Sequence, residues 1–499
     1  MSARPGAFRS ETAEIVRRIA PYLPPLVILA CVTARSTREW GDFGGYAIAG
    51  AAFRVGRYAN DASNNWPPFF SLLAVPLSLL DTLPVRLGRM VWALLGCGAF
   101  ALTAARFFSK VRSSAVPFWA VPVATMLVAP FWGAHILHHQ VYVFVFAACA
   151  EGFFAADRGR DLRAGIWIGV AAATKVTPAF TLAYFLFARR LRVVVAAVAA
   201  ALCCSLLTIP VLGAQGAIDA HRRWIARAVS LHGTFADRNQ SLEALILRWT
   251  VRGKSPDVAW LGPIVPLSTE AAQTVGGLAS AALIAVAAAL SGLRGLPPAE
   301  AFASMIAVST FAAPYCWRSQ MIALFPLLLV LLSRIATRRS DRIDVAALSI
   351  FAVAALLREP GIAGPQLYAL LEGAGLTAIT YLLILANALR GARTLSPLGP
   401  GWVREASMRS GNNTKGPVAG ALFLLPNRWR RGRDSNPPMP FGTPHFEKGV
   451  GRVAPPFGFA LKDPSLRLSR ARLFPLRGGS HRPPRSVSSR LPPTEGRRE

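Results

Sequence analysis

Long apolar stretches alternate with short charged stretches along most of this chain. The apolar stretches cover 19–35, 67–83, 86–108, 115–133, 136–156, 164–188, 191–213, 271–293, 299–316, 319–337, 344–358 and 365–390. Most of them approach the length of about 20 residues that a helix needs to cross a bilayer. They are too long and too rich in Ala and Leu to be strands of a membrane barrel. The pattern therefore predicts an all-α fold, a polytopic membrane helix bundle of about 10–12 spans.

Composition agrees with repeated membrane crossings. Of the 499 residues, 53% are hydrophobic and only 16% are charged, whereas a soluble domain carries roughly 25% charged residues. The six cysteines lie in or at the ends of apolar stretches and show no metal-ligand spacing. We interpret them as packing residues.

Basic residues between the apolar stretches predict the orientation. The clusters are Arg17 and Arg18; Arg106, Lys110 and Arg112; Arg158, Arg160 and Arg163; Arg189, Arg190 and Arg192; and Arg334, Arg338, Arg339 and Arg342. Because Lys and Arg favour the cytoplasmic side of short loops, we place all of them in the cytoplasm, together with an N-terminus at 1–18. The transmembrane domain then covers 19–393. Its loops at about 36–66 and 214–270, and the turn near 314–318, face outside.

Two apolar stretches do not fit simple crossings. The stretch 67–83 is short and contains three prolines, so we expect it to lie in the outer interface or to re-enter the membrane. The stretch 164–188 has arginines at both ends and Lys175-Val176-Thr177-Pro178 in its middle. Since proline removes a helix hydrogen bond and disfavours helix in the preceding residue, we predict a re-entrant helix pair broken at Pro178. Broken helices at membrane depth line cavities.

The chain changes character near residue 394. Residues 394–499 are rich in Pro, Gly, Arg and Ser, and 19 Lys and Arg stand against 6 Asp and Glu between 401 and 499. We interpret this stretch as a disordered basic cytoplasmic tail. Its string RGRDSNPP can be encoded by the reverse complement of a transfer-RNA T-arm, and we hypothesise that part of the tail is translated non-coding DNA. A mass spectrum of the native protein that contains peptides beyond residue 440 would contradict this hypothesis.

Candidate chemistry begins directly after the first apolar stretch, with Asp42. This carboxylate is either a solvated loop residue or a general base, which must lie within hydrogen-bond reach of the hydroxyl it deprotonates. The same loop carries arginines and the aromatic residues Tyr46, Tyr58 and Trp66. Polar and aromatic side chains in such density suit a sugar, whose hydroxyls need donors and acceptors and whose apolar face can rest on a ring.

Lys175 is the most costly residue of the membrane part, since a lysine at the centre of a span costs about 2.5–3.5 kcal/mol. Such residues usually face a cavity, although a lysine near a helix end can also extend to the interface. Together with backbone donors freed at the Pro178 break, Lys175 would suit an anion such as phosphate. Gln140 follows three histidines at the outer end of a span, and we interpret it as a hydrogen-bonding group rather than part of a metal site.

Arginines also lie in segments that we place outside the membrane. Arg222 and Arg223 precede Trp224, and Trp317 precedes Arg318. For Arg222 and Arg223, an anionic partner and the lipid headgroups are equally good explanations, whereas Trp317 and Arg318 can be an interfacial anchor. The chain shows no GxxxxGK[ST], no GxGxxG after a strand and no HExxH. We therefore expect no cofactor, no metal and no nucleic-acid partner, and we expect any activated donor to be lipid-linked and reached within the membrane.

Several motifs, taken in order, resemble those of glycosyltransferase family 87, of the polyprenyl-phosphate-mannose-dependent type. They are DFGGY beginning at Asp42, the proline spacing over 67–76, the segment from Gly133 to Arg192 with its KVTP block at Lys175, NQSL at 239–242 and PYCW at 314–317. The matches run from about residue 40 to 335. Each motif is weak alone, and their order makes the set more specific.

The resemblance implies a GT-C type fold and an inverting transfer of mannose, or a related sugar, from polyprenyl phosphate to a lipid or glycan hydroxyl at the outer face of the membrane. It makes Asp42 the catalytic base. The substrate-binding candidates are Tyr46, Gln140, Lys175, Asn239, Gln240, Ser241, Trp317 and Arg318. Many members of the family carry histidines after the tryptophan of the turn, where this chain has Arg318, Ser319 and Gln320, so we expect different donor or acceptor contacts.

Two other functions are compatible with the pattern. One is a transporter or flippase of a lipid-linked or small polar substrate, to which broken helices and a buried lysine are also suited. The other is a ligase or transferase acting on a different lipid-linked glycan. No internal repeat relates the two halves of the chain, which counts against a transporter. The usage of Arg, Ala and Pro suggests a GC-rich bacterial genome and hence a multi-pass protein of the plasma membrane.

Overall fold

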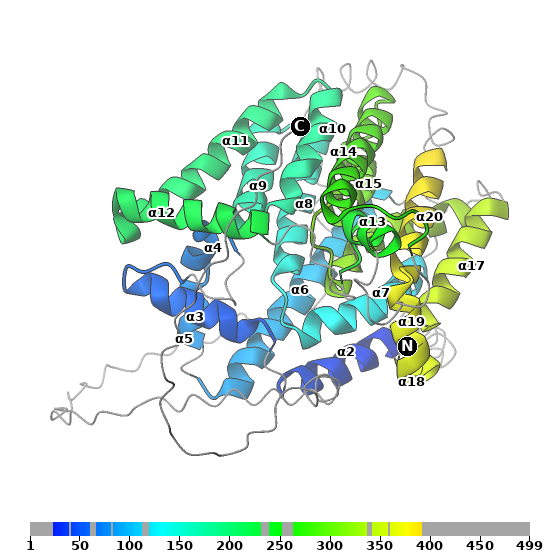
Figure 1. The fold of residues 1–499 in the computed structure, drawn as a ribbon, viewed down its shortest axis with the longest axis horizontal. Coiled ribbons are helices and arrows are strands. Elements are labelled where there is room, and N and C mark those ends of the chain that lie inside the picture. Colours follow the sequence, from blue (N-terminus) through cyan, green and yellow to red (C-terminus); the bar gives the residue numbers. More distant parts are fainter. Residues whose placement is uncertain are drawn as a thin grey trace, which may run out of the picture. The chain divides into compact units, whose positions relative to one another are not determined.

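The computed structural model describes residues 23–38, 41–59, 66–80, 83–111, 119–230, 239–251, 263–336, 342–357 and 360–391. The N-terminus 1–18 and the tail 394–499 lie outside these residues, as do parts of the two predicted outer loops. Within the described residues every named element is a helix (Figure 1). The predicted all-α class is therefore confirmed.

The helices differ widely in length. In chain order they are α2 (Leu23–Ser36), α3 (Phe43–Arg54), α4 (Pro68–Leu73), α5 (Val75–Leu80), α6 (Val85–Val111), α7 (Ala120–Leu137), α8 (Tyr142–Asp157), α9 (Asp161–Thr174), the 3₁₀ helix η2 (Thr177–Thr181), α10 (Leu182–Phe187), α11 (Leu191–Leu206), α12 (Ile209–Ser230), α13 (Leu242–Thr250), α14 (Thr269–Leu293), α15 (Pro298–Phe311), the 3₁₀ helix η4 (Arg318–Leu324), α16 (Phe325–Ala336), α17 (Arg342–Leu357), α18 (Pro360–Ala363), α19 (Pro365–Gly373) and α20 (Leu376–Gly391).

Four described segments are long and apolar enough to cross a membrane. They are Arg86–Lys110, Ala120–Leu137, Thr269–Leu293 and Arg318–Ala336. Two helix pairs, α11 with α12 and α19 with α20, pass the same test together but are bent by 102° and 54°, which raises the number to six if each pair is one span. Shorter apolar helices accompany them. The chain is thus a multi-pass membrane bundle, and the figure of 10–12 crossings stays a prediction.

Basic residues gather where several helices end. Lys110 at the end of α6 pairs with Asp157 at the end of α8 at 2.7 Å. Arg190, before α11, pairs with Asp161 at the start of α9. The Tyr184 hydroxyl of α10 donates to the Leu296 carbonyl between α14 and α15 at 2.8 Å. Three of the clusters that we assigned to one side of the membrane therefore meet at one end of the bundle, called here the basic end.

A second group of contacts joins α14, α16, α17 and α20. Arg334 donates to the Asp344 carboxylate at 2.9 Å, and Asn387 donates to the same oxygen at 2.8 Å. Arg294 donates to the Leu389 carbonyl at 3.3 Å. Arg334 and Asp344 are almost fully buried, and removing one member of a buried ion pair leaves an uncompensated charge. This pair therefore joins α16 to α17, and the hydrogen bonds of Asn387 and Arg294 add α20 and α14 to the same group.

The stretch around Lys175 differs from the prediction. The first helix, α9, ends at Thr174, and Lys175 has an extended backbone (φ −154°, ψ 127°). Pro178 does not break the helix but lies in the first turn of η2, where a missing N–H is tolerated because that group has no intrahelical acceptor. The break thus lies at Lys175, three residues earlier than we expected. The ion pair of Arg190 with Asp161 shows that the stretch returns to its starting end, as a re-entrant pair would.

Close packing holds α9 in place. A Cβ atom on Gly169 would lie 2.3 Å from the Ala197 carbonyl oxygen of α11, and one on Gly165 would lie 2.5 Å from the Val193 carbonyl oxygen. Small residues four positions apart allow helix backbones to approach closely in membranes. Because Lys175 directly follows α9, this contact with α11 fixes the position of the Lys175 backbone.

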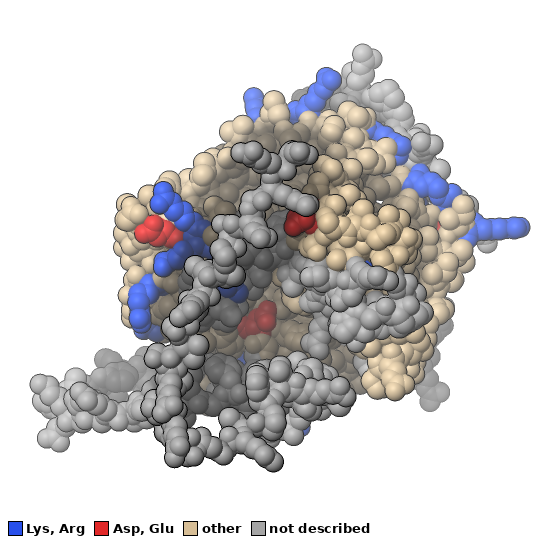
Figure 2. Space-filling model, viewed as in Figure 1, with Lys and Arg blue, Asp and Glu red and all other residues tan. Residues whose placement is uncertain are grey.

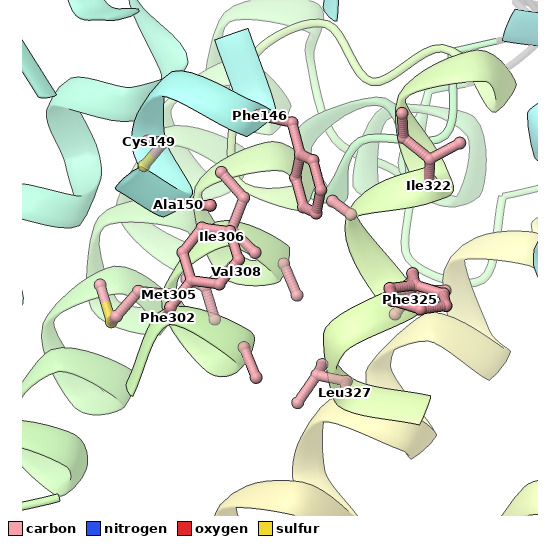
Figure 3. Packing of buried hydrophobic residues seen from close by; sticks show 14 of the residues in the cluster. Phe146, Cys149, Ala150, Phe302, Met305, Ile306, Val308, Ile322, Phe325 and Leu327 are labelled. Carbon is pink, nitrogen blue, oxygen red and sulfur yellow. The ribbon is translucent and has the colours of Figure 1, made fainter. Parts of the chain in front are cut away.

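The hydrophobic core lies around α15 and α16. Figure 3 shows side chains of α8, α15 and the η4–α16 segment packed against each other, including Phe146, Phe302, Ile322 and Phe325, all of which are buried. Phe146 and Phe302 have ring centroids 5.4 Å apart. Every residue of α15 from Ala301 to Phe311 is buried, which places this helix in the interior of the bundle. The core thus fixes α8, which begins two residues after Gln140, and η4, which begins at Arg318.

Candidate active site

Asp42 is held by the loop that joins α7 to α8. The Asp42 backbone N–H donates to the His138 carbonyl at 2.8 Å, and the Gln140 side-chain amide donates to the Asp42 carboxylate. Gly41 has a left-handed backbone (φ 42°), and a Cβ there would lie 2.4 Å from Nδ1 of His139. A glycine is therefore needed before Asp42 for this close approach. Asp42 and Gln140, which we predicted as separate site residues, form one contact.

His139, within this loop, connects it to helix α6. Its carbonyl accepts a hydrogen bond from the Trp92 indole of α6 at 2.9 Å, and its ring is 2% exposed. Burial lowers the pKa of His139 to about 4, so the ring is neutral at physiological pH. Within the described residues, no group of three His, Cys, Asp or Glu side chains is placed to hold a metal ion.

Aromatic residues enclose the first turn of α3. The Tyr46 hydroxyl accepts a hydrogen bond from the Val141 backbone N–H at 3.0 Å, and its ring is fully buried. Trp66 and Phe70 meet the Tyr46 ring edge-on, with centroids 4.7 and 5.1 Å away. Tyr46 therefore braces Asp42 and the α7–α8 loop, and Trp66 is the half-buried member of this group.

The charge state of Asp42 depends on its surroundings. Burial raises the pKa of its carboxyl above the usual value, while the charges of His138 and Lys175 and hydrogen bonds from Gln140 and Tyr46 act in the opposite direction. A carboxylate with a raised pKa is a stronger proton acceptor once it is ionised. The arrangement suits a general base that is partly buried and still accessible to an acceptor.

Lys175 lies within electrostatic range of Asp42. Its Nζ is 5.3 Å from the centroid of the Tyr142 ring, a distance at which a cation is attracted to the ring face. With the Gln320 amide oxygen facing it, Lys175 Nζ donates to that oxygen at 2.7 Å, and the Gln320 amide nitrogen then donates to the Tyr315 carbonyl at 3.2 Å. The opposite amide orientation would set NH₂ against the ammonium group. Gln320 thus holds the Lys175 ammonium group in place.

The segment 239–241 is bound to the turn that precedes η4. Asn239 pairs with Trp317 in an isolated β-bridge, its side chain donates to the Pro314 carbonyl at 2.9 Å, and it accepts from the Cys316 N–H at 3.0 Å. Ser241 caps α13 by accepting from Ala244 N–H at 3.1 Å. The side chains of Asn239, Gln240 and Ser241 are at most 1% exposed. The structure therefore places all three inside the protein, where they hold the turn.

Trp317 and Arg318 lie at the end of that turn and are half-buried. The Trp317 ring is 5.7 Å from the Tyr315 ring, and the Arg318 guanidinium is 5.8 Å from the centroid of the Tyr368 ring. The Gln320 N–H donates to the Trp317 carbonyl at 2.8 Å. The turn is therefore continuous with the residue that holds Lys175.

The match to known families decides what kind of protein carries this site. A family model described as glycosyltransferase family 87 matches residues 65–316, half of the chain. The chain belongs to glycosyltransferase family 87. It is therefore a membrane glycosyltransferase. No curated protein and no solved structure matches it.

The family match includes some of the site residues and not others. Gln140, Lys175 and the segment 239–241 of this family 87 glycosyltransferase lie inside the matched stretch, whereas Asp42 and Tyr46 precede it and Trp317 and Arg318 follow it. The structure nevertheless connects the two groups through the contact of Gln140 with Asp42. The contact of Gln320 with Lys175 was not predicted from the sequence, although Gln320 follows the turn at 314–317. His138 was considered only as one of three histidines beside Gln140, whereas in the structure its carbonyl accepts the hydrogen bond of the Asp42 N–H.

Proposed function

We propose that this glycosyltransferase moves a mannosyl or related sugar unit from a polyprenyl-phosphate donor to a lipid or glycan hydroxyl, with inversion at the anomeric carbon. The observation that carries the proposal is the Asp42 carboxylate, bonded by Gln140 and within electrostatic range of Lys175. A carboxylate and an ammonium group within one site supply the two charges that such a transfer needs: a base for the acceptor and a cation for the leaving phosphate.

In the proposed step, Asp42 takes the proton of the acceptor hydroxyl as its oxygen bonds to the anomeric carbon. The bond between that carbon and the phosphate oxygen breaks on the opposite side, and the electron pair leaves with the polyprenyl phosphate. Lys175, held by Gln320, stabilises the charge that develops on the leaving oxygen. Such preorganised charges act strongly where water is excluded.

Other candidates take supporting roles in this proposal. Tyr46 and Gln140 hold Asp42 in position. Trp317 and Arg318 are accessible enough to contact donor or acceptor, and an arginine there suits a phosphate. The buried segment 239–241 fixes their turn, and its predicted contact with substrate stays a prediction.

We further propose that the site faces the outside of a bacterial plasma membrane. Helix α8 begins beside Gln140 and ends at Asp157 of the basic end, so its 16 residues separate the two ends by about 24 Å, at 1.5 Å per residue. Because basic residues favour the cytoplasmic side, the Asp42 end faces outward, where lipid-linked sugars rather than nucleotide sugars serve as donors.

Sugar transfer by the purified, lipid-reconstituted protein tests the proposal. Radiolabelled polyprenyl-phosphate-mannose and membrane lipid acceptors are supplied to wild type and to Asp42→Asn. Loss of a general base lowers the rate by about 10²- to 10⁴-fold, so we expect that loss while donor binding persists. Asp219→Asn, which changes a carboxylate on α12 that is bonded to Gln215, is the matched control and should transfer normally.

The possible results separate the parts of the proposal. If wild type transfers nothing from this donor but transfers from another polyprenyl-phosphate sugar, the sugar assignment is wrong and the chemistry stands. If Asp42→Asn transfers at the wild-type rate, Asp42 is a loop carboxylate and the base lies elsewhere.

A further inference from the structure

Helix α12 runs at roughly a right angle to α11, the helix that precedes it. The axes of α11 and α12 differ by 102°, and Figure 1 shows α12 leaving the end of α11 at the left of the view. Since α11 runs along α9, which extends from the basic end to Lys175, α12 starts at the Asp42 end. A helix that turns through about a right angle there has the orientation of one lying along a membrane surface.

The exposed face of α12 combines apolar and basic side chains. Ile218 and Ile225 are 48% and 52% exposed, and Arg222, also exposed, lies on the same face because positions i, i+4 and i+7 fall on one side of a helix. The opposite face is buried through Ala217 and Ala220. Apolar side chains next to arginines are typical of a helix at the boundary between acyl chains and headgroups.

The end of α3 adds more basic residues beside α12. A Cβ on Gly56 would lie 3.4 Å from the Val211 carbonyl oxygen of α12, which places the end of α3 against the start of α12. Burial raises the pKa of Tyr58 to about 12, and the charges of Arg223 and Arg227 act in the opposite direction. The two helices are therefore close enough to share one electrostatic environment.

The α3–α12 basic surface consists of Arg54, Arg57, Arg222 and Arg223, all exposed. Figure 2 shows basic side chains gathered at the left, where Figure 1 places α12. Asp219 is the acidic residue of α12, and it accepts a hydrogen bond from Gln215 at 3.1 Å. Four arginines against one such carboxylate give this surface a positive charge, at the end of the bundle opposite the basic end.

We propose that the α3–α12 basic surface binds the phosphate headgroups of anionic glycerophospholipids in the leaflet at the Asp42 end. Guanidinium groups match phosphate oxygens with two parallel hydrogen bonds. The exposed Ile218 and Ile225 lie beside the arginines and contact acyl chains, which a free phosphate ion does not offer. Because α3 begins directly after Asp42, lipid bound here also fixes the helix that carries the site. This inference does not depend on the sugar or donor proposed above.

Lipid binding by the purified full-length protein tests the proposal. Native mass spectrometry records the binding of phosphatidylglycerol and of phosphatidylcholine during titration of wild type and of Arg222→Gln/Arg223→Gln. Each basic residue near an anionic lipid surface contributes a factor of about fivefold to binding. We expect the double variant to lose about that factor for each arginine with phosphatidylglycerol and to bind phosphatidylcholine as wild type does.

Matched variants and a competitor complete the test. Arg222→Lys/Arg223→Lys keeps the charge and should retain most of the phosphatidylglycerol binding. If the glutamine variant does not fold, Arg54→Gln/Arg57→Gln at the end of α3 and just after it is measured in the same way. Unchanged phosphatidylglycerol binding in a folded glutamine variant overturns the proposal. Displacement of the lipid by millimolar glycerol phosphate also overturns it, because the surface would then bind a soluble anion.

Discussion

Among single residues, Asp42 and Lys175 carry the proposed mechanism. Asp42 must be ionised to accept a proton, yet burial favours its neutral form. The positive charge of Lys175 offsets part of that effect. In the proposed mechanism the lysine therefore acts twice: it keeps the base ionised before the reaction and stabilises the phosphate during it.

Replacing Lys175 with methionine separates these two effects. Without the cation, the pKa of Asp42 rises further, so the acidic limb of the profile of kcat/KM against pH should move to higher pH. The rate on the plateau should fall by about 10²- to 10³-fold, the usual effect of removing one group that stabilises the transition state. The measurement is sugar transfer as a function of pH by wild type and Lys175→Met.

Lys175→Arg is the control for charge. It retains the cation, so its acidic limb should stay near the wild-type position even if the plateau is lower. An acidic limb that does not move in Lys175→Met would mean that the charge of Lys175 does not act on Asp42.

The sequence indicated the charged members of the site better than the residues that position them. Lys175 is conspicuous because a lysine within a membrane span is energetically costly. Asp42 is conspicuous because it is a carboxylate directly after a span. Gln320 is an ordinary polar residue until folding brings η4 against Lys175. Asn239 was expected to bind substrate, and that stays a prediction. Its side chain contacts a turn that lies 75 residues away along the chain. No local pattern encodes such a pairing.

At the scale of helices, hydropathy located the long elements and missed their changes of direction. The predicted stretches 86–108 and 271–293 correspond to α6 and α14. The single stretch 191–213 instead contains the junction of α11 with α12, with a left-handed Gly213 inside α12. Apolar composition reports burial in lipid or protein, but it does not report the direction of the backbone. Turns within apolar sequence are therefore the features that hydropathy cannot place.

The contact between α9 and α11 gives a prediction at this scale. In Gly169→Ala the new methyl group would lie 2.3 Å from the Ala197 carbonyl oxygen, so the two helices must separate. Overpacking of this kind costs about 1–3 kcal/mol, and it also moves Lys175. We expect a lower thermal unfolding temperature in detergent and reduced sugar transfer.

Gly277→Ala is the matched control, because Gly277 also lies within a helix and a Cβ there would meet nothing within 4 Å. Alanine favours a helix over glycine by about 1 kcal/mol, so this variant should unfold at the wild-type temperature or above it. If both variants behave alike, the α9–α11 contact is not as close as the structure places it.

On the scale of the whole molecule, two ends of the bundle carry different chemistry. The basic end gathers ion pairs such as Lys110 with Asp157, and the opposite end carries Asp42, Lys175 and the α3–α12 basic surface. The arginines of that surface run against the usual preference of basic residues for the cytoplasmic side. Bound lipid phosphate at the outer leaflet would neutralise them, so the proposed orientation and the proposed lipid surface are compatible.

Labelling of cysteines in intact cells tests the orientation. Arg38, which precedes Asp42, and Arg158, at the end of α8, are exposed arginines outside the long helices. In a background where the exposed Cys31 and Cys203 are changed to serine, Arg38→Cys should react with a membrane-impermeant maleimide added from outside. Arg158→Cys should react only after the membrane is opened, because about 24 Å of α8 separates the two ends. The reverse labelling would place Asp42 on the cytoplasmic side, where a donor with its sugar on the outer leaflet cannot reach it, and the proposed donor would have to be abandoned with the orientation.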